Sequence, residues 1–135
     1  MYEYVDKNEY GPAKKDFESI IRKAQIILRT EKGITFQPRL VGSGGRHLIT
    51  RLVGGNKGFD LDYNLALKRS AKGYDPKYIR DSFLYAFQIA VKGTKYKVEN
   101  STSAITIKYV NKNVIAYSCD LAVIDYDSEF DDVGY

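Results

Sequence analysis

Apolar residues recur along this chain with two different spacings, and these spacings predict where helices and strands lie. A helical spacing follows Gly11-Pro12 and predicts a first helix that ends near Gly33. A second helix is expected over residues 75–93, since an aspartate followed by proline is typical of a helix start and glycine of a helix end. A leucine pair at i, i+4 predicts a further short helix within residues 46–53.

Alternating apolar and polar residues predict five strands, most of them in the second half of the chain. The first strand is expected over residues 34–41, broken at Pro38, and the second over residues 59–67. The remaining strands are expected over residues 95–100, 104–110 and 114–124. The pattern therefore predicts an α+β or mixed α/β domain in which one sheet is backed by at least two helices.

Two aspartates, Asp60 and Asp62, interrupt the apolar strand over residues 59–67. Residues i and i+2 of a strand point to the same side, so both carboxylates project from one face while the alternate residues face the core. Neighbouring carboxylates repel, and a cation that neutralises them removes this cost. A divalent metal such as Mg²⁺ binds carboxylate oxygens and keeps positions open for phosphate. A solvated sheet face is the alternative that the pair alone leaves open.

Composition fits one globular domain over residues 1–135, with 44% hydrophobic and 28% charged residues. The sequence contains no apolar stretch of membrane-spanning length and no signal-peptide pattern at its start, and the single Cys119 excludes an internal disulfide, so we expect a cytoplasmic protein. Residues 125–135 hold five acids and no Lys or Arg, and we expect them to form a flexible tail. The 124 residues before them carry 21 basic and 12 acidic side chains, hence a charge of +9, which suits a polyanionic ligand.

Two further features bear on the aspartate pair. Gly42-Ser43 follows the strand predicted over residues 34–41, and glycine turns of this kind let backbone N–H groups and a serine hydroxyl point at phosphate oxygens. Asp120 lies in an otherwise apolar strand, where a charged side chain needs a partner or a metal unless it sits at the strand's edge or end. In order along the chain, the turn, the aspartate pair and the third aspartate form one set of candidate residues.

The set resembles the DNA polymerase β-like nucleotidyltransferases, and most closely the branch of oligoadenylate synthetases and bacterial cyclic-oligonucleotide synthases. The matching segments are residues 42–46, 55–62 and 118–121, within a matched region of residues 34–124. The resemblance implies a mixed sheet backed by helices, as in the polymerase β palm. It also implies Mg²⁺-dependent transfer of a nucleoside monophosphate from a nucleoside triphosphate to a hydroxyl acceptor, with release of pyrophosphate.

The resemblance further implies a role for each matching residue. Asp60, Asp62 and Asp120 would be the catalytic metal ligands for two Mg²⁺ ions, with Mn²⁺ as a substitute, and Asp120 would help to deprotonate the acceptor. The triphosphate would be bound by the glycine turn and by flanking cations, namely Gly42, Ser43, Arg46 and Lys57, with Arg51 as a further cation nearby.

Enzymes of this branch also carry a helical C-terminal region that closes over the base, and this sequence stops soon after the strand of Asp120. We therefore expect a catalytic core without that region, which either uses a helical partner protein or is part of a longer protein. The acceptor stays open among a nucleotide, RNA, a small molecule and a protein side chain. A second interpretation is a weakly active or inactive nucleotide-binding, RNA-binding or interaction module of the same fold. A two-metal nuclease is a third, although the strand of Asp62 lacks the lysine that often accompanies such sites.

Overall fold

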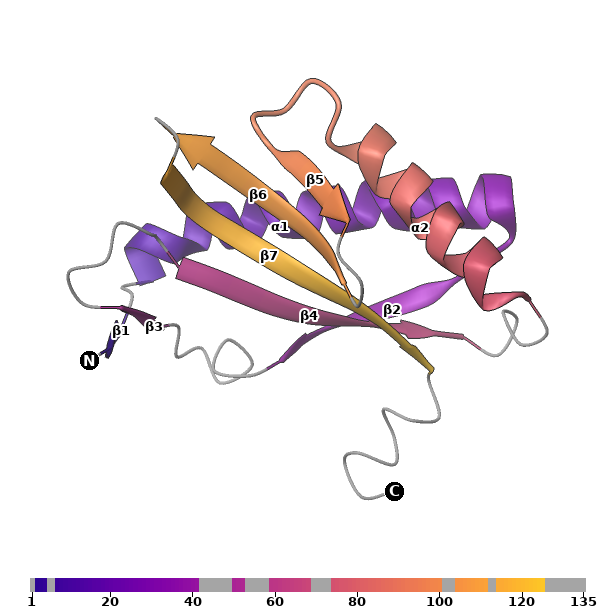
Figure 1. Cartoon of the computed structure of the whole chain (residues 1–135), viewed down its shortest axis with the longest axis horizontal. Helices are drawn as coiled ribbons and strands as arrows, with labels where there is room; N and C mark the ends of the chain where they lie inside the picture. The colour runs from indigo at the N-terminus through magenta and orange to yellow at the C-terminus, as the bar shows by residue number, and fades with distance from the viewer. Residues whose placement is uncertain are drawn as a thin grey trace, which may run out of the picture.

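The structure is a computed structural model, which describes residues 2–4, 7–41, 50–52, 59–68, 74–100, 104–111 and 114–125 (Figure 1). The elements in chain order are β1 (Tyr2–Tyr4), α1 (Lys7–Ile27), the π-helical turn η1 (Leu28–Lys32), β2 (Phe36–Val41), β3 (Thr50–Leu52), β4 (Phe59–Leu67), α2 (Pro76–Ala90), β5 (Lys97–Asn100), β6 (Ile105–Asn111) and β7 (Val114–Asp125).

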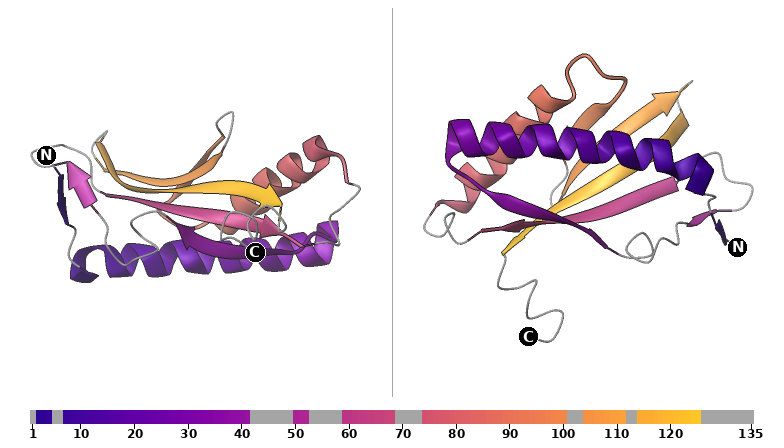
Figure 2. Two further views of the ribbon diagram at one scale, coloured as in Figure 1. Left: turned by 90° about the horizontal axis from the view of Figure 1, so that it is seen from below. Right: turned by 180° about the vertical axis from the view of Figure 1, so that it is seen from behind.

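Within the described residues, five strands form one mixed sheet in the order β2-β4-β7-β6-β5. The pairing of β4 with β7 is parallel, and the other three pairings are antiparallel. Both α1 and α2 pack against one face of this sheet, and the long helix α1 runs across the strands (Figure 2). The predicted α+β architecture, a mixed sheet backed by two helices, is therefore confirmed. No described helix covers the other face, which we call the open face.

The core lies between the helices and the sheet, and alternation along each strand selects its members. On β4, Leu61, Tyr63 and Leu65 are buried, and they meet Phe17 of α1 and Phe83 of α2 within one apolar cluster. Burial of side chains of this size stabilises the fold by about 1.5–3 kcal/mol each. The residues between them on β4 consequently point to the open face.

The start of α2 follows the sequence prediction. The side chain of Asp75 caps the helix by accepting a hydrogen bond of 3.0 Å from the backbone N–H of Lys77, and Pro76 occupies the first helical position. The predicted end of the first helix is also close to that observed, since Gly33 adopts a left-handed φ of 67° after η1. A side chain with a Cβ would be strained at that backbone angle.

Three local predictions were wrong. The first helix begins at Lys7 and includes Pro12, because a proline in the second turn keeps a helical φ and removes only one backbone hydrogen bond. Strand β2 runs through Pro38 without a break, which an edge strand tolerates since one of its sides has no ladder to complete. Within residues 46–53, Thr50–Leu52 forms strand β3 and not a helix.

Residues 50–52 form strand β3 for a physical reason that local spacing does not reveal. It pairs antiparallel with β1, an element that the sequence pattern did not predict, and Tyr2 lies opposite Leu52. Backbone pairing with a partner some fifty residues away decides the conformation here. The last strand also extends one residue beyond its predicted end, since Asp125 pairs with Leu67, while the rest of the expected tail lies outside the described residues.

Candidate active site on the open face

Two of the three predicted catalytic aspartates project from β4 onto the open face. Asp60 and Asp62 alternate with the buried residues Leu61 and Tyr63, so their carboxylates point away from the helices. Both aspartates are exposed to solvent. The alternation in the sequence therefore placed this pair correctly on the face opposite the core.

The parallel pairing of β4 with β7 brings the third aspartate to the same place. In the register of these strands Asp62 lies opposite Asp120, and Asp60 lies opposite Ser118. Paired residues of neighbouring strands point to the same face, and the strands are about 4.8 Å apart. Three carboxylates thus gather on two adjacent central strands, although nearly sixty residues separate Asp62 from Asp120 in the sequence.

Two hydroxyl groups hold the carboxylates of Asp60 and Asp120. The Ser118 hydroxyl donates a hydrogen bond of 2.5 Å to Oδ1 of Asp60. The Thr106 hydroxyl, on β6, donates one of 2.7 Å to Oδ1 of Asp120. These described bonds engage only one oxygen of each carboxylate, and they fix its direction on the sheet.

The two hydroxyl residues were not identified from the sequence. Ser118 could have been found, because it precedes Asp120 by two positions and so shares its strand face. Thr106 carries no such signal, since it meets Asp120 only through the antiparallel register of β6 with β7. Its place in the site depends on the pairing of two strands and not on local spacing.

The gathered charges change the acidity of the middle aspartate. Partial desolvation raises the pKa of Asp62, and the negative charges of Asp120 and Asp60 raise it further. One cation lies near the cluster on β6, where Lys108 is opposite Ser118, but its ammonium is paired with the carboxylate of Glu99. The carboxylates therefore form a negative site that favours a proton or a metal cation.

The donor set suits a hard divalent cation, but it does not form a closed cage. Among the residues that the structure describes, no group of three or more His, Cys, Asp or Glu side chains is arranged so that it could hold a metal ion. Mg²⁺ does not need such a cage, because it usually takes one or two carboxylates together with water and substrate phosphate. Metal binding by Asp60, Asp62 and Asp120 stays a prediction that this chemistry permits.

The residues predicted to bind phosphate lie outside the described part of the chain, namely Gly42, Ser43, Arg46 and Lys57. The chain enters that segment beside the carboxylates, since Val41 pairs with Asp62 at the end of β2. The further cation, Arg51, lies in β3 opposite Glu3. The ordering of β2 and β4 thus agrees with a phosphate turn next to the aspartates, without locating it.

Comparison with solved structures finds the same fold in bacterial nucleotide-processing enzymes. The chain matches the CD-NTase CdnG of Bradyrhizobium diazoefficiens, solved in complex with GTP, with a TM-score of 0.59 and 18% identity over 88% of this chain and 32% of that chain. It matches a mutant of the Vibrio cholerae di-nucleotide cyclase DncV with a TM-score of 0.51 and 13% identity over 96% of this chain and 34% of that chain. DncV with nonhydrolyzable GTP gives a TM-score of 0.51 and 15% identity, over 91% and 32% of the two chains.

These matches confirm the predicted fold, since the chain shares the fold of CdnG and DncV. This chain spans about a third of the length of those proteins. No family model matches the sequence, and no curated protein matches it. Among the described residues, no helix is both long and apolar enough to cross a membrane.

Proposed function

We propose that this chain is the catalytic core of a nucleotidyltransferase, which moves a nucleoside monophosphate from a nucleoside triphosphate to a hydroxyl group. The single observation that carries the proposal is the parallel register of β4 and β7, which sets Asp62 opposite Asp120 with Asp60 beside them. The raised pKa of Asp62 adds to it, since partial desolvation and then the charges of Asp120 and Asp60 cause that shift. GTP is bound in neighbours of the same fold, which supports a nucleotide substrate.

In the reaction, the oxygen of the acceptor hydroxyl bonds to the α-phosphorus, the bond from that phosphorus to its bridging oxygen breaks, and pyrophosphate leaves. Asp120 accepts the hydroxyl proton, and Thr106 orients Asp120 for this task through the hydrogen bond to Oδ1. Asp60 and Asp62, with Asp120, would hold two Mg²⁺ ions, for which Mn²⁺ could substitute. Bound metal would neutralise phosphate charge and lower the pKa of the attacking hydroxyl.

The remaining proposed contacts hold the substrate in place. Gly42 and Ser43 would bind the β- and γ-phosphates, and Arg46 and Lys57 would neutralise their charge, as the sequence resemblance implies. The acceptor is a hydroxyl of a nucleotide, RNA, a small molecule or a protein. Holding the donor and acceptor in line supplies a large part of the rate in such reactions.

The direct test measures pyrophosphate release from radiolabelled nucleoside triphosphates with Mg²⁺ and a panel of hydroxyl acceptors. Asp60→Asn with Asp62→Asn should lower release at least about 100-fold, because the charge that binds the metal and stabilises the transition state is lost. Asp81→Asn on α2 is a control that removes one exposed carboxylate away from the site, and it should leave release unchanged. EDTA should abolish release in both the parent and the control.

The alternative outcomes separate the other functions. Triphosphate binding without pyrophosphate release, in the presence of every acceptor, would refute the proposed transferase activity and favour a nucleotide-binding module. Cleavage of nucleic acid without added triphosphate would point to a nuclease. Equal activity of the Asp60→Asn/Asp62→Asn variant and the parent would remove the carboxylates from the reaction altogether.

A further inference from the structure

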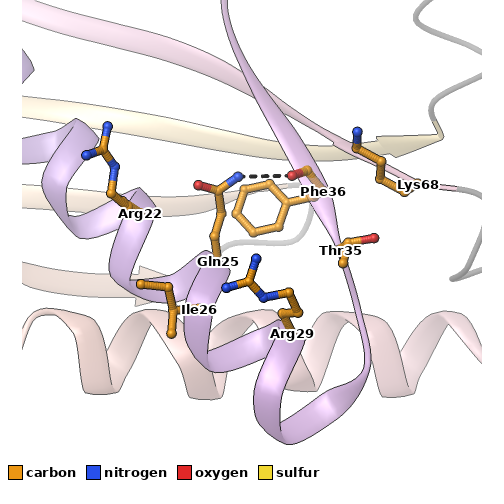
Figure 3. A pocket seen from close by; sticks show the side chains of 7 residues that line it. All are labelled: Arg22, Gln25, Ile26, Arg29, Thr35, Phe36 and Lys68. Atoms are coloured by element: carbon orange, nitrogen blue, oxygen red, sulfur yellow. Dashed lines mark hydrogen bonds between the residues drawn. The ribbon is translucent and has the colours of Figure 1, made fainter.

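A second candidate site lies at the far end of β4, between α1 and the edge strand β2. It is a cavity of about 510 Å³, a size typical of small-molecule sites (Figure 3). The lining side chains come from α1, from η1, from the beginning of β2 with the residue before it, and from the residue that follows β4, namely Arg22, Gln25, Ile26, Arg29, Thr35, Phe36 and Lys68.

The cavity is strongly positive. Three of its lining residues are the cations Arg22, Arg29 and Lys68, and none of its described lining residues is acidic. Arg22 lies on α1 and Arg29 lies seven residues further along, on the π-helical turn η1 that continues it, and both line the cavity. Within the described residues, neither arginine takes part in a salt bridge or a side-chain hydrogen bond. Two arginines that share one cavity and have no acidic partner among the described residues favour an anionic ligand.

The cavity also has an ordered and partly apolar wall. The amide nitrogen of Gln25 donates a hydrogen bond of 3.0 Å to the backbone oxygen of Phe36, which ties α1 to the edge of the sheet (Figure 3). The Phe36 ring packs on Phe83 with 5.2 Å between ring centroids, so this side of the cavity is fixed by the core. Ile26 is 49% exposed and adds apolar surface beside the arginines. An anion with an apolar or aromatic body would therefore contact both the arginines and the apolar wall.

The cavity is separate from the candidate active site. Lys68 follows Asp60 by eight residues, and β4 is extended between them, which corresponds to about 26 Å. Arg22 belongs to α1 and Arg29 to η1, both on the helix-covered face, whereas the aspartates project from the open face. A ligand of the cavity could not simultaneously contact the three carboxylates unless it were much longer than a mononucleotide.

We propose that this cavity binds a nucleotide polyphosphate at a site distinct from the catalytic carboxylates. The guanidinium groups of Arg22 and Arg29 match phosphate oxygens in a bidentate manner, and the Lys68 ammonium adds a third positive charge. The apolar surface of Ile26 and the edge of Phe36 receive the base. The proposal goes beyond the transfer reaction, because this site needs neither a metal ion nor the three aspartates.

Calorimetric titration with GTP in EDTA tests this site. The parent chain should bind GTP, and inorganic tripolyphosphate should compete with it, whereas guanosine should not bind measurably. Arg22→Gln with Arg29→Gln should weaken GTP binding about tenfold or more, since both charged groups that pair with phosphate are lost. Lys15→Gln with Lys23→Gln removes the same charge from exposed positions of α1 outside the cavity, and it should change affinity less than about twofold.

Other results would overturn the proposal. These are an equal loss of affinity in the two double variants, unchanged binding in Arg22→Gln/Arg29→Gln, binding of guanosine as tight as that of GTP, or a failure of tripolyphosphate to compete. Circular dichroism of each variant shows whether it is folded. The Asp60→Asn/Asp62→Asn variant separates the two sites: it should keep the arginine-dependent binding while pyrophosphate release is lost. If the parent releases no pyrophosphate but still binds GTP through Arg22 and Arg29, the proposed transfer reaction is refuted and the proposed binding site is not.

Discussion

The two faces of β4 differ in what they contribute to the molecule. Leu61 and Leu65 point to the helix-covered face and are 1% and 0% exposed, so they stabilise the fold by burial. Asp60 and Asp62 alternate with them on the open face, where their charges and that of Asp120 repel one another. The helix-covered face therefore provides stability, and the open face holds an arrangement that costs stability and suits cation binding.

The largest expected effect on stability comes from the covered face. Leu65→Ala should lower the free energy of unfolding by about 2–5 kcal/mol, because it removes buried methyl groups and leaves a cavity in the core. Urea denaturation measures this change. Asn64→Ala, the neighbouring substitution on the open face, should stay within about 0.5 kcal/mol of the parent. Similar losses at both positions would mean that the open face is covered as well.

The hydroxyl contacts of the open face should affect activity more than stability. Ser118→Ala and Thr106→Val should each lower pyrophosphate release about 10–100-fold, since they remove the groups that orient Asp60 and Asp120. Thr106→Ser keeps a hydroxyl and should restore a substantial part of the rate. If Thr106→Val and Thr106→Ser have the same rate, the hydrogen bond to Asp120 has no positioning role.

The smallest expected effect is a gain in stability when the charge of Asp62 is removed. Without metal at neutral pH, Asp62→Asn should raise the free energy of unfolding by less than about 1 kcal/mol, because the residue is exposed and solvent screens the repulsion. The pKa of Asp62 is raised in the folded state, so the folded state binds its proton more tightly than the unfolded state. The charge of Asp62 is therefore most destabilising above its folded-state pKa.

The stability difference between Asp62→Asn and the parent should depend on pH. As pH falls through the raised pKa toward the ordinary value of 3.8, Asp62 becomes protonated in the folded protein and the difference from Asp62→Asn should shrink. Urea denaturation of both proteins across this pH range measures the difference. A difference that grows toward acid would show that Asp62 is stabilised by a positive partner and not strained by Asp60 and Asp120.

Much of the fold could be predicted from the sequence because it rests on local signals. The Asp75-Pro76 cap, the apolar stripe of α2 and the alternation along β4 each involve residues within a few positions of one another. The short strand β3 could not be predicted, since its leucine spacing resembles that of a helix and its partner is β1. Local spacing fails where a distant backbone completes the hydrogen bonds.

The candidate site divides in the same way. The sequence by itself determined that Asp60 and Asp62 share a strand face and that Cys119 and Asp120 point to opposite sides, because alternation is a property of any extended strand. Only the tertiary structure decided that Asp120 lies opposite Asp62 and that Thr106 holds it, since these contacts depend on which strands pair and in which register. Register is fixed by packing of the whole core on α1 and α2, and no short segment of the chain contains that information.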